Sequence, residues 1–249
     1  MRYISFFVLV TSFLSGIVCA QNRATEIFEE VDSRRSKITY EKTDMKMVIY
    51  NSKGNKRVRQ ISSFSFNEGE EEKSLLLFEE PANVRGTGFL TLSDGNTEVQ
   101  KLYLPALGRI QTITASQKGD KFMGSDFTYE DLGDQNPDDY EFELVTENET
   151  TAVLRAVKID DSQYAYIKFY IDTERYSLEK AEYFNNDDEM IKRLEAENFS
   201  NVDSNIWRAN KMIMYDLRAN RKTELIWSNR AINESISDWR FTERGLKRS

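Results

Sequence analysis

Adjacent pairs of acidic residues are the side chains of this sequence best suited to chemistry. The pairs are Glu130/Asp131, Asp138/Asp139, Asp160/Asp161 and Asp187/Asp188. Hydrolysis of a glycosidic bond needs two carboxyl groups that face each other across a cleft. Adjacent residues of a strand point to opposite faces, so no pair supplies this arrangement by itself. We therefore interpret all four pairs as solvated turns.

The residue types that most often build active sites and metal sites are missing. The chain has no histidine, which excludes Ser-His-Asp and Cys-His catalysis and nearly every zinc or copper site. It has no P-loop and no glycine-rich dinucleotide motif. The acidic stretch Asn185–Glu189 lacks the spacing and the glycine of a calcium loop. We expect no enzymatic activity, no metal and no cofactor.

Residues 1–20 have the pattern of a cleaved secretory signal peptide. Arg2 precedes an apolar run, and Val18 and Ala20 occupy the −3 and −1 positions of a signal-peptidase site. The run is too short to span a membrane. Cys19 follows Val18 rather than the small residue of a lipobox, so we do not expect lipidation. Cleavage after Ala20 removes the only cysteine, so the mature protein would contain no thiol.

The remaining residues, 21–249, are expected to form a single domain. With 3 Pro, 11 Gly and no low-complexity tract, the sequence shows no linker. The net charge of −8 and the absence of a basic block argue against nucleic acid as a partner. We expect a monomer exported to the periplasm.

The hydrophobic pattern predicts one helix followed by many strands. Apolar residues Ile27, Phe28 and Val31 form a stripe in the predicted helix over residues 23–37. From Ile38 onward, short β-rich runs alternate with turn signals, about a dozen in all. Consecutive hairpin connections predict a mainly β fold, a half-open antiparallel β-barrel covered by a few helices.

Several predicted strands have one apolar face. The run "DMKMVIY" places Met45, Met47 and Ile49 together. The run "YAYIKFYID" separates Tyr164, Tyr166, Lys168 and Tyr170 from Ala165, Ile167, Phe169 and Ile171. The run "IWRANKMIMYDL" separates Ile206, Met212 and Met214 from Trp207, Ala209, Ile213 and Tyr215. Such a face either fills a core or lines a cavity, and the pattern leaves both open.

Three segments together resemble a known family. They are "FEEPANVRGTGFLTL" (residues 78–92), "KLYLPALGRIQTI" (residues 101–113) and "FMGSDFTYEDL" (residues 122–132). In this order they are similar to the outer-membrane lipoprotein-sorting proteins of Gram-negative bacteria, which are LolA-like in fold. The resemblance implies a periplasmic carrier of lipid or lipoprotein acyl chains, with an inner-membrane exporter of the RND type as a looser association. One departure is Glu80 before Pro81, where the lipoprotein carriers have an arginine that latches the lid; Arg85 follows four residues later.

The segment "FMGSDFTYEDL" is expected to be a structural plug or lid over the sheet. Gly124 is followed by Ser125 and Asp126, either of which could cap the start of a helix. Phe122, Met123, Phe127 and Tyr129 would then point at the barrel mouth. The candidate ligand-binding residues are Phe89, Leu102, Phe127 and Met212, whose faces depend on strand register. The flexible side chain of Met212 suits variable acyl chains.

Two functions fit these observations. The first is a periplasmic carrier or binding protein that holds the acyl chains of a lipid or lipidated cargo between sheet and lid. The alternative is a non-transport interaction protein of the cell envelope, such as a stress sensor or an exporter accessory subunit. Lipid extraction or native mass spectrometry of the purified protein separates the two.

Overall fold

One large β-sheet forms the framework of the molecule. A computed structural model describes residues 11–247 of the chain. In this part of the chain 13 strands form a single antiparallel sheet in the order β6-β5-β4-β3-β2-β1-β13-β12-β11-β10-β9-β8-β7. The strands are β1 (Tyr40–Tyr50), β2 (Lys56–Glu68), β3 (Glu71–Glu80), β4 (Gly88–Ser93), β5 (Glu98–Leu104), β6 (Arg109–Thr112), β7 (Tyr140–Glu147), β8 (Thr151–Lys158), β9 (Tyr166–Asp172), β10 (Ser177–Phe184), β11 (Met190–Asp203), β12 (Ile206–Asp216) and β13 (Arg221–Ile232). The two α-helices are α1 (Thr11–Ser36) and α2 (Glu243–Leu246).

The sheet is curved but open. Within residues 11–247, the edge strands β6 and β7 make no pairing with each other, so no barrel is closed. The predicted mainly β class and the half-open antiparallel sheet of about a dozen strands are thereby confirmed. The expected helical cover consists of α1 together with short 3-10 turns.

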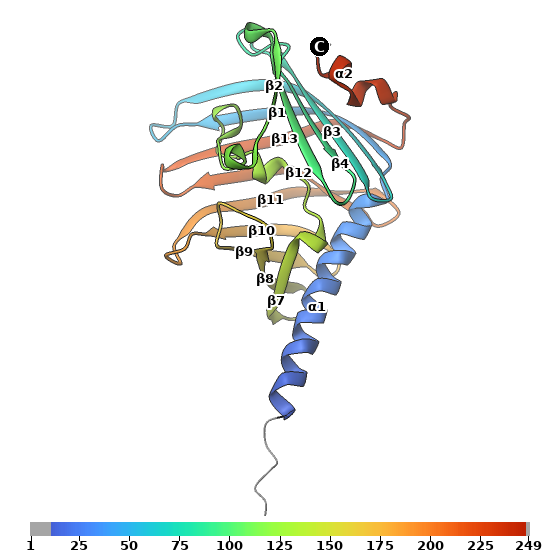
Figure 1. Ribbon diagram of the computed structural model, residues 1–249, viewed down its shortest axis with the longest axis vertical. Helices are drawn as coiled ribbons and strands as arrows, with labels where there is room; N and C mark the ends of the chain where they lie inside the picture. The colour runs from blue at the N-terminus through green and yellow to red at the C-terminus, as the bar shows by residue number, and fades with distance from the viewer. Residues whose placement is uncertain (1–10, 248–249) are drawn as a thin grey trace, which may run out of the picture.

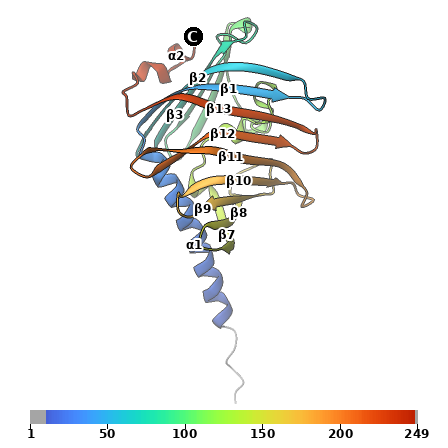
Figure 2. The same ribbon diagram turned by 180° about the vertical axis from the view of Figure 1, so that it is seen from behind.

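The first and last strands pair in the middle of the sheet. β1 and β13 run antiparallel from Glu41↔Ile232 to Tyr50↔Lys222. From this seam the chain winds outward to β6, crosses over as residues 113–139, and winds back from β7 to β13. We call residues 113–139 the plug, because they lie on the concave side between the two halves of the sheet (Figures 1 and 2).

The main hydrophobic core lies on the concave side. Met45, Met47 and Ile49 of β1 are buried together there, as their alternation predicts. Ile167 and Phe169 of β9 belong to the same core. The apolar face of each strand is therefore covered from inside the curve, by α1 on one half and by the plug on the other.

Helix α1 confirms the helix predicted over residues 23–37 and begins earlier, at Thr11. Its Phe28 ring lies 4.7 Å from the ring of Phe142 and 5.1 Å from that of Phe169. This packing fixes the helix along β7 to β10. Residues 1–10 of the expected signal peptide lie outside the described residues, so the signal peptide stays a prediction. Between residues 11 and 247, no helix has the length and hydropathy needed to span a membrane.

A second, smaller core lies on the outer face of β2 to β4. The segment from Asp238 to Leu246, which includes α2, covers Leu75, Leu77 and Leu90 there. The approach is close: a Cβ atom added to Gly88 would lie 2.5 Å from the carbonyl oxygen of Leu246. Glycine at this position therefore lets the chain end pack directly on β4.

Candidate functional site

The plug is buried core rather than a helical lid. The predicted helix capped by Ser125 or Asp126 is wrong: this stretch forms 3-10 turns at Phe122–Gly124 and Glu130–Leu132, joined around a single bridge between Lys121 and Thr128. The compact turn pairs its own backbone, since the N–H of Phe122 donates to the carbonyl of Phe127 at 2.8 Å. The ring of Phe122 is fully buried, with centroids 4.9 Å from Phe89 and 5.9 Å from Phe78.

A buried carboxylate fixes the plug to the sheet. Asp126 has no exposed surface, and its Oδ2 accepts a hydrogen bond from the hydroxyl of Thr223 on β13 at 2.7 Å. Arg221 lies 3.2 Å from Oδ1 and Lys121 lies 3.4 Å from it. A buried charge is tolerated only when it is paired in this way. The plug therefore has one defined position on the concave face.

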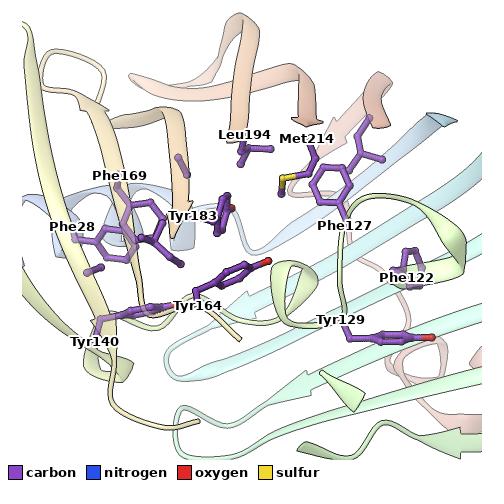
Figure 3. Close-up of a cluster of buried hydrophobic side chains, with 14 of the residues drawn as sticks. Phe28, Phe122, Phe127, Tyr129, Tyr140, Tyr164, Phe169, Tyr183, Leu194 and Met214 are labelled. Atoms are coloured by element: carbon purple, nitrogen blue, oxygen red, sulfur yellow. The ribbon is translucent and has the colours of Figure 1, made fainter. Parts of the chain in front are cut away.

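A cavity of about 300 Å³ lies beside the plug, between α1 and the concave face of β9 to β12. Apolar side chains form most of the wall that these elements share. Among the residues of that wall are Phe28, Val31, Ile171, Leu194, Trp207 and Met212. Figure 3 shows several aromatic rings of this region, with Phe28 and Phe169 at one end and Tyr164 and Tyr183 further in. The volume is at the lower end of the range for small-molecule sites.

The inner end of the cavity is polar and fully paired. Asp131 accepts hydrogen bonds from the Tyr164 hydroxyl at 2.7 Å and from the Lys192 ammonium at 2.9 Å. The oxygen that accepts from Lys192, Oδ2, also accepts a hydrogen bond from the backbone N–H of Thr128 at 2.7 Å. Burial raises the pKa of Tyr164 well above its ordinary value, and the charge of Asp131 raises it further. The tyrosine therefore stays protonated and donates, which makes this network a structural anchor rather than a reactive group.

The acidic pair Glu130/Asp131 corrects the expectation of solvated turns. Glu130 is 9% exposed and accepts hydrogen bonds from the Ser162 hydroxyl at 2.5 Å and the Gln163 N–H at 3.2 Å. The side chain of its neighbour Asp131 is 1% exposed and belongs to the network above. Both carboxylates connect the plug to the segment before β9. In the described chain, no group of three or more acidic or cysteine side chains could hold a metal ion.

Partly exposed side chains mark the open side of the cavity. Arg34 of α1 donates to the carbonyl of Arg175 at 3.2 Å and stacks on the ring of Tyr176, 4.4 Å from its centroid. The guanidinium of Arg175 lies 4.6 Å from the ring centroid of Phe199 and 5.9 Å from that of Trp207. The mouth therefore combines aromatic rings with basic side chains, between the C-terminal half of α1 and the β9–β10 turn.

The four predicted site residues lie in three different surroundings. Met212 is in the wall of the large cavity. Phe89 lines a smaller cavity of about 160 Å³ under the plug. Leu102 and Phe127 are buried in the concave core and line neither of these two cavities. Contact of any of the four with a ligand stays a prediction.

A break in strand alternation explains which wall residues the sequence did not reveal. The regular pattern places Trp207 and Ala209 on the face opposite Met212, yet all three line the cavity. Asn198 on β11 has a positive φ of 57°, and the pairing of β11 with β12 skips Asn198 and Asn210. The face that points inward therefore changes at this point. Tyr164 similarly precedes β9 and turns inward, although alternation would place it outside with Tyr166.

Position 80 lies away from the cavity. Glu80 ends β3, and Arg85 donates from Nε to the carbonyl of Glu79 at 2.8 Å. Arg85 is thus bound to its own turn. This contact holds the turn between β3 and β4 and supplies no latch to the plug.

Comparison with solved structures shows close likeness to proteins of one fold. A domain from Vibrio parahaemolyticus that is named for outer membrane lipoprotein sorting is 28% identical, with a TM-score of 0.87 over 92% of this chain and 100% of its own. A DUF1329 family protein from Desulfovibrio piger is 24% identical, with a TM-score of 0.85 over 91% of this chain and 99% of its own. A LolA superfamily protein from Nitrosomonas europaea is 20% identical, with a TM-score of 0.69 over 88% and 97%. The last two establish the fold alone.

Sequence comparison adds the family. The curated proteins contain no significant match to this sequence. A family model whose description reads "Uncharacterized protein" matches residues 70–248. This range covers more than half of the chain and includes the plug, the cavity strands and the C-terminal cover. The chain belongs to this family, and the resemblance to LolA-like lipoprotein-sorting proteins that its sequence suggested is confirmed.

Proposed function

We propose that the protein is a periplasmic carrier that holds the acyl chain of a lipid or lipidated cargo in the cavity between α1 and the sheet. The observation that carries this proposal is the cavity itself, about 300 Å³ and walled mainly by apolar side chains. Transfer of each CH₂ group from water into such a site is worth about 0.8 kcal/mol. An acyl chain therefore supplies enough binding free energy without any further chemistry.

The arrangement of the cavity supports a carrier more than a catalyst. The charged groups at its inner end, Asp131 and Lys192, are bonded to each other and to Tyr164. A catalytic group needs to reach a substrate, whereas these groups hold the plug. The relative named for outer membrane lipoprotein sorting gives the cargo class a precedent. An exporter of the RND type remains a prediction from the sequence resemblance alone.

A cavity-filling substitution tests the carrier. Met212→Trp places a larger side chain in the wall, and we expect it to weaken fatty-acid binding at least about tenfold while the protein stays folded. Met190→Trp is the matched control, because Met190 lies outside the cavity lining. Titration calorimetry with a saturated fatty acid measures both variants, and thermal melts establish that they fold.

Native mass spectrometry of the purified protein completes the test. Copurified lipid that is lost in Met212→Trp and kept in Met190→Trp would support the carrier. Unchanged fatty-acid affinity in a folded Met212→Trp protein would contradict it. A tightly bound protein partner with no lipid would favour the interaction role in the cell envelope.

A further inference from the structure

The sheet divides between β12 and β13 at the end nearest the cavity. Their pairing stops at Lys211↔Ile226, whereas β12 stays paired with β11 as far as Ile206. β13 instead follows β1 as far as Glu41↔Ile232. Among the described residues, the stretch Ile206–Asn210 therefore has no strand partner on the β13 side. A surface pocket of about 490 Å³ lies in this split.

The split and the cavity share the same short stretch of β12. Arg208 and Ala209 line the cavity, and the next residue, Asn210, lines the pocket in the split. Arg230 of β13 reaches across, and its Nη2 donates to the carbonyl of Ala209 at 3.2 Å. Arg208 at the cavity and Arg230 at the split are therefore neighbours, and a molecule with its tail in the cavity would bring its head to this pair of side chains.

Two guanidinium groups share one carboxylate at this point. Glu41 accepts hydrogen bonds from Arg230 Nη1 and from Arg208 Nε, the latter at 3.4 Å. The side chain of Arg230 is only 12% exposed, and that of Arg208 is 19% exposed. Burial lowers the pKa of both arginines, and for Arg208 the charges of Arg35 and Arg230 act in the same direction against Glu41. Arg208, Arg230 and Glu41 together carry a net charge of +1 in a chain that is acidic overall.

One donor of this group has no acceptor. Arg230 Nε is buried and makes no hydrogen bond with the described residues. A buried N–H without an acceptor is unfavourable and rare in native proteins. An oxygen of a bound anion would satisfy it, since guanidinium groups match the planar geometry of carboxylate and phosphate.

We propose that Arg208 and Arg230 bind the anionic headgroup, a carboxylate or a phosphate, of a single-chain amphiphile whose tail occupies the cavity. The proposal rests on the carrier function and adds the charge of the cargo. Glu41 then competes with the headgroup for the two arginines. Release of the cargo leaves the arginines on Glu41 instead of unpaired.

The test compares ligands of equal tail length by titration calorimetry. The ligands are a saturated fatty acid, the corresponding alkyl phosphate and the corresponding alcohol; acetate and inorganic phosphate serve as heads without tails. We expect the two anionic amphiphiles to bind about tenfold more tightly than the alcohol. Acetate and inorganic phosphate should show no binding at the same concentrations.

Three variants assign the preference to the split. Arg208→Gln and Arg230→Gln should each remove the difference in affinity between the anionic amphiphiles and the alcohol. Glu41→Gln removes the competing carboxylate and should raise the affinity for the fatty acid several-fold, which is an effect of opposite sign. Arg193→Gln is the control, because Arg193 pairs with Glu195 away from both hollows.

Each outcome decides between the hypotheses. Equal affinity of the wild-type protein for the acid and the alcohol would overturn the headgroup site and leave the carrier standing. Failure of every tailed ligand to bind would overturn the carrier as well. Binding of free acetate or phosphate as tightly as the amphiphiles would replace the proposal by a simple anion site. If an arginine variant does not fold, the wild-type ligand series and Glu41→Gln decide alone.

Discussion

The two halves of the concave face are covered in different ways. Over β2 to β5 the plug inserts Phe122 among Phe78, Phe89 and Tyr129, and a cavity of only about 160 Å³ remains. Over β9 to β12 the cover is α1, and about 300 Å³ remains. An irregular segment can follow a curved sheet and fill it, whereas a helix is a nearly straight cylinder. The hollow on the helix side follows from this mismatch of shapes.

The strongest way to break this comparison is to place a charge in the plug. Phe127 is 3% exposed, so Phe127→Asp buries a carboxylate without a designed partner. We expect a loss of several kcal/mol in the free energy of unfolding, measured by urea denaturation. Phe127→Leu keeps the site apolar and should cost much less. If Phe127→Asp unfolds at the urea concentration of the wild-type protein, the plug is a peripheral lid and the comparison fails.

A matched pair of leucines sharpens the comparison. Leu102 in the plug half and Leu194 in the cavity wall are 5% and 6% exposed. Truncation to alanine in a packed core costs about 2–5 kcal/mol, and less where packing is already incomplete. We expect Leu102→Ala to destabilise more than Leu194→Ala in urea denaturation.

The two leucine variants should rank in the opposite order when the measured quantity is the change in fatty-acid affinity instead of the loss of stability. Leu194→Ala changes the cavity wall and should alter fatty-acid affinity, whereas Leu102→Ala should leave it as in the wild-type protein. Equal destabilisation together with equal binding would show that the two halves are packed alike. Altered binding in Leu102→Ala alone would place the ligand under the plug.

The smallest expected effect concerns the turn at the cavity mouth. Partial burial alone would raise the pKa of the Asp172 carboxyl, but the backbone N–H and the guanidinium of Arg175 outweigh it and hold the pKa below its ordinary 3.8. The contribution to stability is therefore complete above pH 3.8 and is lost as the pH falls through the lower folded-state value. Asp172→Asn should cost less than about 1 kcal/mol at pH 7, because the pair is partly solvated.

The pH series checks the sign of that effect. The stability difference between wild type and Asp172→Asn should shrink as the pH falls below about 4, followed by thermal melts in the range where both proteins fold reversibly. A difference that grows on acidification would mean that the carboxyl is stabilised in its protonated form. Asp216 at the end of β12 offers a comparison, because its pKa is also lowered, against burial, by Lys121 of the plug.

Much of the fold could be predicted because local patterns determine it. The alternation of Met45, Met47 and Ile49 and the stripe of Ile27 and Phe28 specify buried faces without reference to the rest of the chain. Hairpin connections then specify an antiparallel order. The family resemblance supplied the openness of the sheet, which strand periodicity alone does not determine.

The site was harder to predict because it depends on distant contacts and on one irregular position. In the sequence Asp131 has the pattern of a solvated acid, because its partner Lys192 is 61 residues away and comes beside it only in the folded protein. Trp207 reads as a residue of the opposite face because nothing but the asparagine at position 198, a residue that tolerates positive φ, hints at the break. Strand faces can be assigned residue by residue, whereas a cavity also depends on what covers them.

The seam between β1 and β13 has a consequence for how force would act on the molecule. Glu41 at the beginning of β1 is paired with Ile232 at the end of β13, so the chain enters and leaves the sheet at neighbouring points. A pull applied to residues just before β1 and just after β13 would load the hydrogen bonds of this seam one after another, beginning at Glu41↔Ile232. The sheet would therefore open from its centre under small forces, while both outer hairpin series stay intact.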